Sequence, residues 1–187
     1  MSNIAVVATS SVTPADVSRY QFGSRFGRMD PVCQLGLTAV EALGVKFGSR
    51  ADIGVIVATN AGSLTTDVQY WRTRNEPGGV SPSLFIYTLP SSVTGEIAIR
   101  HGLTGPNLCL LGGCDQVLGE AAEWLRHGEA TGCVCVECDV VATDAGELAG
   151  VPVVARAWAA FLQRGGGGIP LTENDRDLRS LCARVRA

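Results

Sequence analysis

The stretch Gly105-Pro106-Asn107-Leu108-Cys109-Leu110-Leu111-Gly112-Gly113-Cys114 decides the fold of this chain. It predicts a turn at its start, a short apolar strand over Leu108 to Leu111, and a bend at the two glycines. A helical pattern follows from Asp115 to His127. A cysteine at such a corner lies at a helix N-terminus, where free N–H groups and the helix dipole favour the thiolate. We therefore expect Cys114 to be a nucleophile.

Composition limits the classes of protein to consider. The chain has 187 residues, 46% hydrophobic and 18% charged, which is enough for one domain with a substantial core. The net charge of -3 does not indicate the basic surface that is typical of nucleic-acid-binding proteins. No apolar stretch is long enough to span a membrane, and the N-terminus lacks a signal-peptide layout. Seven cysteines, mostly in apolar runs, indicate buried thiols of a reduced, cytoplasmic protein.

Strand and helix signals alternate along the chain. Further strands are expected at Ile4–Thr9, Ile53–Thr59, Gly132–Val136 and Val151–Leu162. The last segment is rich in alanine, so a helix is the alternative there. Further helices are expected from Asp30, as N-cap, to Gly44, then over Leu64–Arg74 and Leu89–His101. This alternation predicts an α/β protein, an α/β/α layered domain around a five-stranded, mostly parallel mixed sheet.

The C-terminal part is expected to separate from this domain. Residues 1–164 form the predicted domain, Gly165–Gly168 a flexible glycine linker, and residues 169–187 a polar tail or short helix. The helix signal begins at Thr172 and continues with Leu178 and Leu181 on one face. The tail docks on the domain, docks on a partner, or remains disordered; the sequence leaves all three open.

Five motifs occur in the order and at the spacing of a β-ketoacyl synthase: Arg28-Met29-Asp30-Pro31, Ile53-Gly54-Val55-Ile56-Val57, Val80-Ser81-Pro82, Gly102-Leu103-Thr104-Gly105-Pro106 and Gly128-Glu129. The distance from Gly105-Pro106 to Cys114 also matches that from the family's Gly-Pro to its acyl-accepting cysteine. The resemblance covers roughly Ile4 to Val141 and, more weakly, Val151 to Arg164. It implies the N-terminal half of the thiolase fold.

The resemblance also implies a site and partners. Cys114 would accept the acyl group, with Gly113 and Asp115 beside it, and Phe85, Ile86 and Tyr87 would line the acyl tunnel. Asp115 suits a cap of the following helix, and Gly113 keeps the bend permissive. Implied partners are an acyl carrier protein or acyl thioester, and a second ketosynthase-like chain in a homodimer or heterodimer joined at the strand Leu108–Leu111. No cofactor, metal, nucleic acid or membrane is implied.

The chain also departs from the family. In ketosynthases the C-terminal half supplies two histidines, a lysine and a glycine-rich loop, whereas this chain has only His101 and His127. The predicted helix from Asp115 to His127 is about 20 Å long at ~1.5 Å per residue, so His127 is not the base for Cys114. Two hypotheses therefore stay open. The first is an acyltransferase-like enzyme of fatty acid or polyketide-type biosynthesis that uses Cys114. The second is a catalytically inactive partner subunit or scaffold, in which Cys114 is only a small residue at a tight corner.

Three other patterns suggest weaker alternatives. Cys133, Cys135 and Cys138 have the C-x-C-x-x-C spacing of a zinc or redox site, but their place in a buried strand favours core thiols. Residues 112–116 are similar to a hydrolase nucleophile elbow, although Gln116 replaces its second glycine. The segment Tyr70–Arg74 suits contact with a carrier protein or nucleotide-like arm, and equally a solvated helix face.

Overall fold

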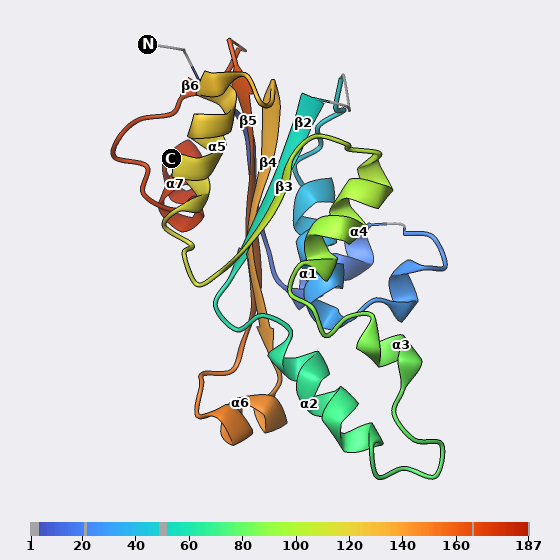
Figure 1. The fold of residues 1–187 in the computed structure, drawn as a ribbon. Helices are drawn as coiled ribbons and strands as arrows, with labels where there is room; N and C mark the ends of the chain where they lie inside the picture. Colours follow the sequence, from blue (N-terminus) through green and yellow to red (C-terminus); the bar gives the residue numbers. More distant parts are fainter. Residues whose placement is uncertain (1–3, 21, 49–51, 166, 187) are drawn as a thin grey trace.

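A six-stranded mixed sheet forms the centre of the computed structural model, which describes residues 4–20, 22–48, 52–165 and 167–186 (Figure 1). The strand order is β3-β2-β4-β5-β1-β6. The strands are β1 (Ile4–Val12), β2 (Ile53–Thr59), β3 (Asn107–Leu111), β4 (Gly132–Val141), β5 (Val154–Arg164) and β6 (Ile169–Pro170). The alanine-rich segment, for which the sequence allowed a strand or a helix, is therefore a strand, β5.

Strand directions confirm the expected mixed character of the sheet. β2 pairs in parallel with both β3 and β4. β5 runs antiparallel to β4 and β1, so that β1, β2, β3 and β4 share one direction. The expected count of five strands was wrong by one, because the two-residue β6 also pairs with β1. A strand of two residues is too short to leave an alternating pattern in the sequence.

Helices cover both faces of the sheet, which confirms the α/β/α layering. The helices are α1 (Pro31–Glu41), α2 (Leu64–Thr73), α3 (Pro82–Phe85), α4 (Ser92–His101), α5 (Val117–His127), α6 (Thr143–Ala149) and α7 (Leu178–Arg186), with short 3-10 helices η1 (Pro14–Arg19) and η2 (Phe26–Arg28). α1 and α4 lie on one face, α5 and α7 on the other, and α2 and α6 lie beyond the carboxyl ends of β2 and β4 (Figure 1). None of these described helices is long and apolar enough to cross a membrane.

Local sequence explains the central elements. All seven residues of β2 are buried, as expected for a strand covered on both faces. Asp30 caps α1 by accepting a hydrogen bond from the Cys33 N–H at 2.9 Å, and Pro31 opens the helix. β4 continues to Val141, five residues past its expected end, and carries the acidic residues Glu137 and Asp139 in a buried position.

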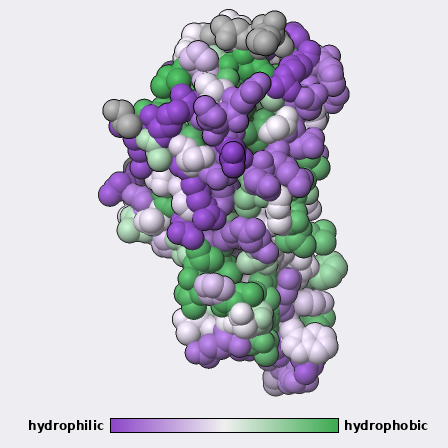
Figure 2. All heavy atoms as spheres, turned by 90° about the vertical axis from the view of Figure 1, so that its left-hand side faces the viewer, coloured by the Kyte–Doolittle hydropathy of each residue, from purple (hydrophilic) through white to green (hydrophobic). Residues whose placement is uncertain are grey.

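The core has two parts, one on each face of the sheet. Side chains of β4 alternate between them: Val134, Val136 and Cys138 pack with α1 and α4, while Cys133 and Cys135 pack with α5 and α7. Figure 2 shows the α5/α7 side of the molecule, where hydrophobic side chains gather in the lower part. Leu148 of α6 and Val153 before β5 are exposed by 70% and 60%, so the apolar surface includes residues at this end of the fold.

The C-terminal segment contacts the sheet. Leu178 and Leu181 of α7 are fully buried in the cluster on the α5/α7 face. The thiol of Cys182 donates a hydrogen bond to the carbonyl oxygen of Ser10 at 3.3 Å, and Pro170 of β6 pairs with Ala5. The division into domain, linker and tail stays a prediction, and Gly166 lies outside the described residues.

Removing the buried Leu181 side chain tests this docking. Leu181→Ala should lower the free energy of unfolding by about 2–5 kcal/mol, because it leaves a cavity between α7 and the sheet. Ala183→Ser, at an exposed position of the same helix, is the control and should cost about 0.5 kcal/mol. Urea denaturation followed by circular dichroism measures both, and equal effects of the two variants would contradict the docking.

Candidate active site around Cys114

Cys114 lies at the corner between β3 and α5, as the sequence predicted. Gly112 and Gly113 have φ angles of 75° and 60°, a region that side chains disfavour. The N–H of Gly112 donates to the carbonyl oxygen of Thr59 at 2.8 Å, which ties the corner to the end of β2. The N–H of Gln116 donates to the carbonyl oxygen of Gly113 at 2.8 Å, so that residues 113–116 form a turn.

This turn delays the helix. α5 begins at Val117 rather than at Asp115, and its N-cap is Gln116, which makes no side-chain capping hydrogen bond. Asp115 is exposed before the helix, so its expected role as the cap is wrong. Cys114 therefore precedes the first helical turn, where the effect of the dipole is weaker.

A hydrogen-bond network from β2 and β4 reaches the thiol. The side-chain amide of Asn60 lies with its nitrogen 3.3 Å from the Cys114 sulfur and 3.1 Å from Asp139 Oδ2. Asp139 Oδ1 accepts three further hydrogen bonds, from the Thr59 hydroxyl at 2.6 Å and the N–H groups of Asn60 and Ala61 at 2.9 Å each. Asp139 thus fixes the turn that presents Asn60 to the sulfur.

An ion pair between the buried Glu137 and the exposed Arg179 lies on the same face of the sheet. Glu137 of β4 is 1% exposed, and its Oε1 accepts hydrogen bonds from Arg179 Nε and Nη2 at 2.9 and 2.5 Å. Its other oxygen, Oε2, has no hydrogen-bond partner among the described residues. The Arg179 guanidinium also lies 4.7 Å from the ring centre of Trp158. Because Arg179 belongs to α7, the C-terminal helix contributes directly to this side of the corner.

The surroundings of Cys114 favour the thiol. Burial, together with the carboxylates of Glu137 and Asp139, raises the pKa of Cys114 to about 11, although the Asn60 hydrogen bond and Arg179 act in the opposite direction. The expectation that the helix terminus would favour the thiolate is therefore wrong. At neutral pH roughly one molecule in ten thousand carries the nucleophilic form.

Neither histidine assists the sulfur. His127 ends α5 at the opposite end from Cys114, exposed, with its Nε2 3.7 Å from Glu123 Oε2. His101 ends α4 and packs edge-on against Phe47, on the other face of the sheet, with ring centres 5.2 Å apart. In the described part of the chain, Cys114 therefore has an amide neighbour and no imidazole base.

The predicted tunnel residues lie apart from Cys114. Phe85 and Ile86 are 61% and 62% exposed at the end of α3. Tyr87 is buried in the cluster on the α1/α4 face, and its hydroxyl donates to Glu96 Oε1 at 3.1 Å. Cys114 packs with the cluster on the opposite face, so that only Gly113 and Asp115 of the predicted lining adjoin it. Acyl-tunnel lining by the three residues stays a prediction.

The other patterns give no second site among the described residues. Cys133 and Cys135 lie on one face of β4, with sulfurs 3.9 Å apart, and Cys138 lies on the other, so the three do not converge on one metal ion. On α2, Arg74 stacks over Trp71 at 3.8 Å and Arg72 pairs with Asp144. These contacts fit a solvated helix face.

The sequence patterns did not predict the network residues Asn60, Glu137, Asp139 and Arg179. Two signals were present: acidic residues at 137 and 139 interrupt an otherwise apolar segment, and Asn60 directly follows β2. A buried carboxylate requires hydrogen-bond or ionic partners. A strand that reaches Val141 buries Glu137 and Asp139 and therefore implies partners for both. Arg179 left no local signal, because its contact with Glu137 joins residues 42 positions apart.

Comparisons with known proteins identify the family. A family model described as "Beta-ketoacyl synthase, N-terminal domain" matches residues 10–148. The chain therefore belongs to the β-ketoacyl synthase family, as its N-terminal domain, and has the thiolase fold. A sequence search of the curated proteins finds no match.

Solved structures share the fold at low sequence identity. "The ishigamide ketosynthase/chain length factor" has a TM-score of 0.74 and 16% identity, over 97% of this chain and 72% of that one. The ketosynthase ApeO in complex with its chain length factor ApeC, from Xenorhabdus doucetiae, has a TM-score of 0.65 and 16% identity, over 88% and 80%. A β-ketoacyl synthase from Burkholderia phymatum STM815 has a TM-score of 0.67 and 14% identity, over 88% and 59%.

The pKa of Cys114 makes a prediction about its reactivity. Alkylation of Cys114 by iodoacetamide should accelerate with pH up to a midpoint near 11, because the reagent reacts with the thiolate. Glu137→Gln removes a carboxylate that raises this pKa, so the midpoint should move to lower pH. The rate at pH 8 should then rise, because a larger fraction of Cys114 is thiolate at that pH. Mass spectrometry of the Cys114 peptide measures the rate.

The control for this experiment is Glu129→Gln, at an exposed position after α5. It should leave the midpoint unchanged. A midpoint near 8 in the unmodified protein would contradict the raised pKa, and an equal change in both variants would contradict the role of Glu137.

Proposed function

We propose that this chain is a ketosynthase-like subunit of fatty acid or polyketide-type biosynthesis, with Cys114 as the acceptor of an acyl group from a carrier-protein thioester. The observation that carries the proposal is the Cys114 corner. The strand, the cysteine after it and the following helix match the family there, and Asn60 contacts the sulfur at 3.3 Å. The proposed step forms a bond between the cysteine sulfur and the acyl carbon, breaks the carrier's thioester bond, and returns the thiol proton to the carrier's sulfur.

Condensation is left to another chain in this proposal. Stabilising an enolate requires imidazoles, and neither histidine lies beside Cys114. The raised pKa of the thiol likewise calls for a base or a cation from outside the described residues. A catalytically inactive partner subunit or scaffold is the second candidate, because the same raised pKa also suits a cysteine that never reacts.

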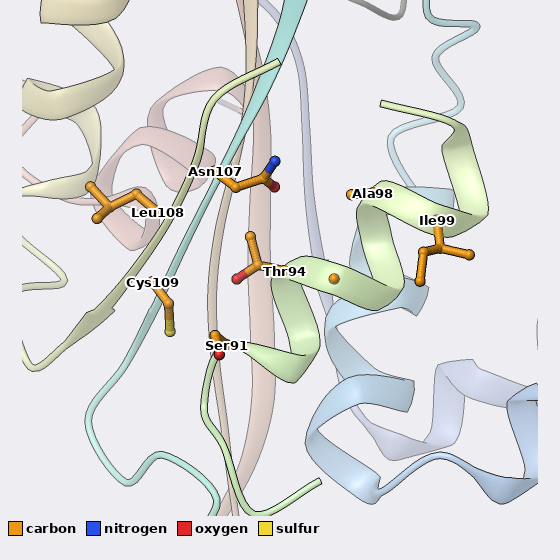
Figure 3. Close-up of a pocket in the computed structure, with 8 residues that line it drawn as sticks. Ser91, Thr94, Ala98, Ile99, Asn107, Leu108 and Cys109 are labelled. Carbon is orange, nitrogen blue, oxygen red and sulfur yellow. The ribbon is translucent and has the colours of Figure 1, made fainter. Parts of the chain in front are cut away.

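The surface beside β3 supports a second chain as partner. β3 is the last strand on its side of the sheet, so one edge of its backbone has no neighbour among the described residues. Next to it lies a groove of about 350 Å³ between α4 and β3, lined by Thr94, Ala98, Ile99, Asn107 and Cys109 among others (Figure 3). Leu111 at the end of β3 is 70% exposed and Ile99 of α4 is 63% exposed. We propose that β3 of a second ketosynthase-like chain pairs at this edge, and that for the isolated protein this chain is a second copy.

Acylation tests the first part of the proposal. After incubation with an acyl thioester, intact-mass spectrometry should show one acyl adduct that forms faster as the pH rises toward 11, because the thiolate is the nucleophile. Cys114→Ala should abolish the adduct, and Cys109→Ala, which removes the other half-buried thiol, should retain it. An unmodified protein at every pH would favour the inactive subunit.

Disruption of the β3 edge tests the second part. The purified protein should elute as a dimer in size-exclusion chromatography with light scattering. Leu111→Glu should convert it to a monomer, because the charge would be buried beside the paired strands. Leu148→Glu is the matched control, since Leu148 is also 70% exposed but lies on α6. A soluble monomer of the unmodified chain at all concentrations would contradict the dimer.

A further inference from the structure

A pocket of about 390 Å³ opens on the α5/α7 side of the sheet, next to the Cys114 corner. The turn after β2, the ends of β4 and β5, the loop between α6 and β5, and Arg179 of α7 form its walls. Its lining includes Asn60, Leu64, Val141, Val154, Arg156 and Arg179. The volume lies at the small end of the range for ligand sites, roughly 300–1,000 Å³.

The strand register explains why this space is open. Glu137 lies opposite Trp158, Asp139 opposite Arg156, and Val141 opposite Val154, all on the same face of β4 and β5. α7 covers the first of these pairs through Arg179, which contacts both Glu137 and Trp158. The next two pairs lie beyond α7 and form the floor of the pocket. This is the lower part of the face in Figure 2, where hydrophobic side chains gather.

The walls of the pocket are mainly apolar. Leu64, Val141, Val151, Pro152 and Val154 supply aliphatic surface from three different segments of the chain. Val151 is 39% exposed, so this surface is accessible to a ligand from solvent. An aliphatic chain that covers these side chains removes apolar area from water on both partners, which favours binding.

Arg156 is the charged group of the lining that lacks a partner. Its guanidinium lies 5.1 Å from the ring centre of Trp158, and within the described residues no oxygen accepts a hydrogen bond from it. The other charged side chains at the pocket are already engaged. Asp139 accepts hydrogen bonds from the Thr59 hydroxyl, two backbone N–H groups and the Asn60 amide, and Arg179 is paired with Glu137. Arg156 is exposed at the pocket, and its N–H donors have no acceptor from the described chain.

We propose that this pocket binds a medium-chain aliphatic monocarboxylate, with the carboxylate on Arg156 and the chain against Leu64 and Val154. A guanidinium matches a carboxylate through two parallel hydrogen bonds, and the Trp158 ring contacts this guanidinium at 5.1 Å. The ligand is bound without a covalent bond. This binding goes beyond the proposed function, because it requires neither acylation of Cys114 nor a partner chain.

Calorimetric titration of the full chain with sodium octanoate tests the proposal. Octanoate should bind, and Arg156→Gln should weaken its binding at least tenfold, because the variant removes the charge and the paired donors. The matched control is Arg74→Gln, since Arg74 also stacks on a tryptophan, Trp71, but lies at the end of α2 outside the pocket. This control should bind octanoate like the unmodified protein.

Two further ligands separate the carboxylate from the chain. Octan-1-ol has the same chain without the charge, and acetate has the charge without the chain; both should bind at least tenfold more weakly than octanoate. Absence of octanoate binding, equal binding of octan-1-ol, or equal loss in both arginine variants would overturn the proposal. Cys114→Ala should retain octanoate binding, so that a failure of acylation and a failure of this site are recognised separately.

Discussion

The carboxylate of Asp139 is the interaction on which the candidate site depends. It receives four hydrogen bonds from the end of β2 and the turn that follows, although it belongs to the neighbouring strand β4. Thr59, held in this way, accepts a hydrogen bond on its hydroxyl oxygen from the Gly62 N–H, and its carbonyl oxygen accepts one from Gly112. One buried acid therefore orders the turn after β2, the corner before α5 and the Asn60 amide. Replacing it with an apolar residue would leave several buried donors without an acceptor, a larger cost than the loss of one contact.

The same face of β4 carries two carboxylates that lower the reactivity of Cys114. Glu137 and Asp139 organise the face of β4 that adjoins Cys114, and both raise the pKa of its thiol. Arg179 reduces this effect because it places a positive charge between α7 and β4, close to Glu137. The hydrogen bonds that stabilise the corner therefore work against its reactivity. In a ketosynthase-like protein this conflict has a physical solution, since a cation brought near Glu137 or the sulfur would lower the pKa without disturbing the strands.

Local patterns predicted what is decided locally. β2 has its expected bounds because every residue is apolar or β-branched, and Asp30 caps α1 because an aspartate followed by proline favours that conformation. The corner at Gly112 and Gly113 was likewise predicted, since positive φ angles favour glycine. The delayed start of α5 was not, because the helical sequence pattern already begins at Asp115, inside the turn that the Gln116 N–H closes on Gly113. The partners of Glu137 and Asp139 come from segments about 40 and 80 positions away, which no periodicity encodes.

The incomplete site and the free strand edge lead to the same conclusion. With a pKa of about 11, half of Cys114 is thiolate only near pH 11, roughly four pH units above neutral. The chain offers Asn60 to the sulfur, and an amide hydrogen bond alone does not offset burial beside two carboxylates. Meanwhile β3, which leads directly to Cys114, has a backbone edge with no neighbour among the described residues and ends in the exposed Leu111. A partner that pairs with β3 would also remove water from the corner three residues away. Loss of water alone raises the pKa of the thiol further, so activation requires that the partner also brings a cation or a base to the sulfur. In the proposed dimer, strand pairing would therefore activate the cysteine only together with a cation or base from the partner.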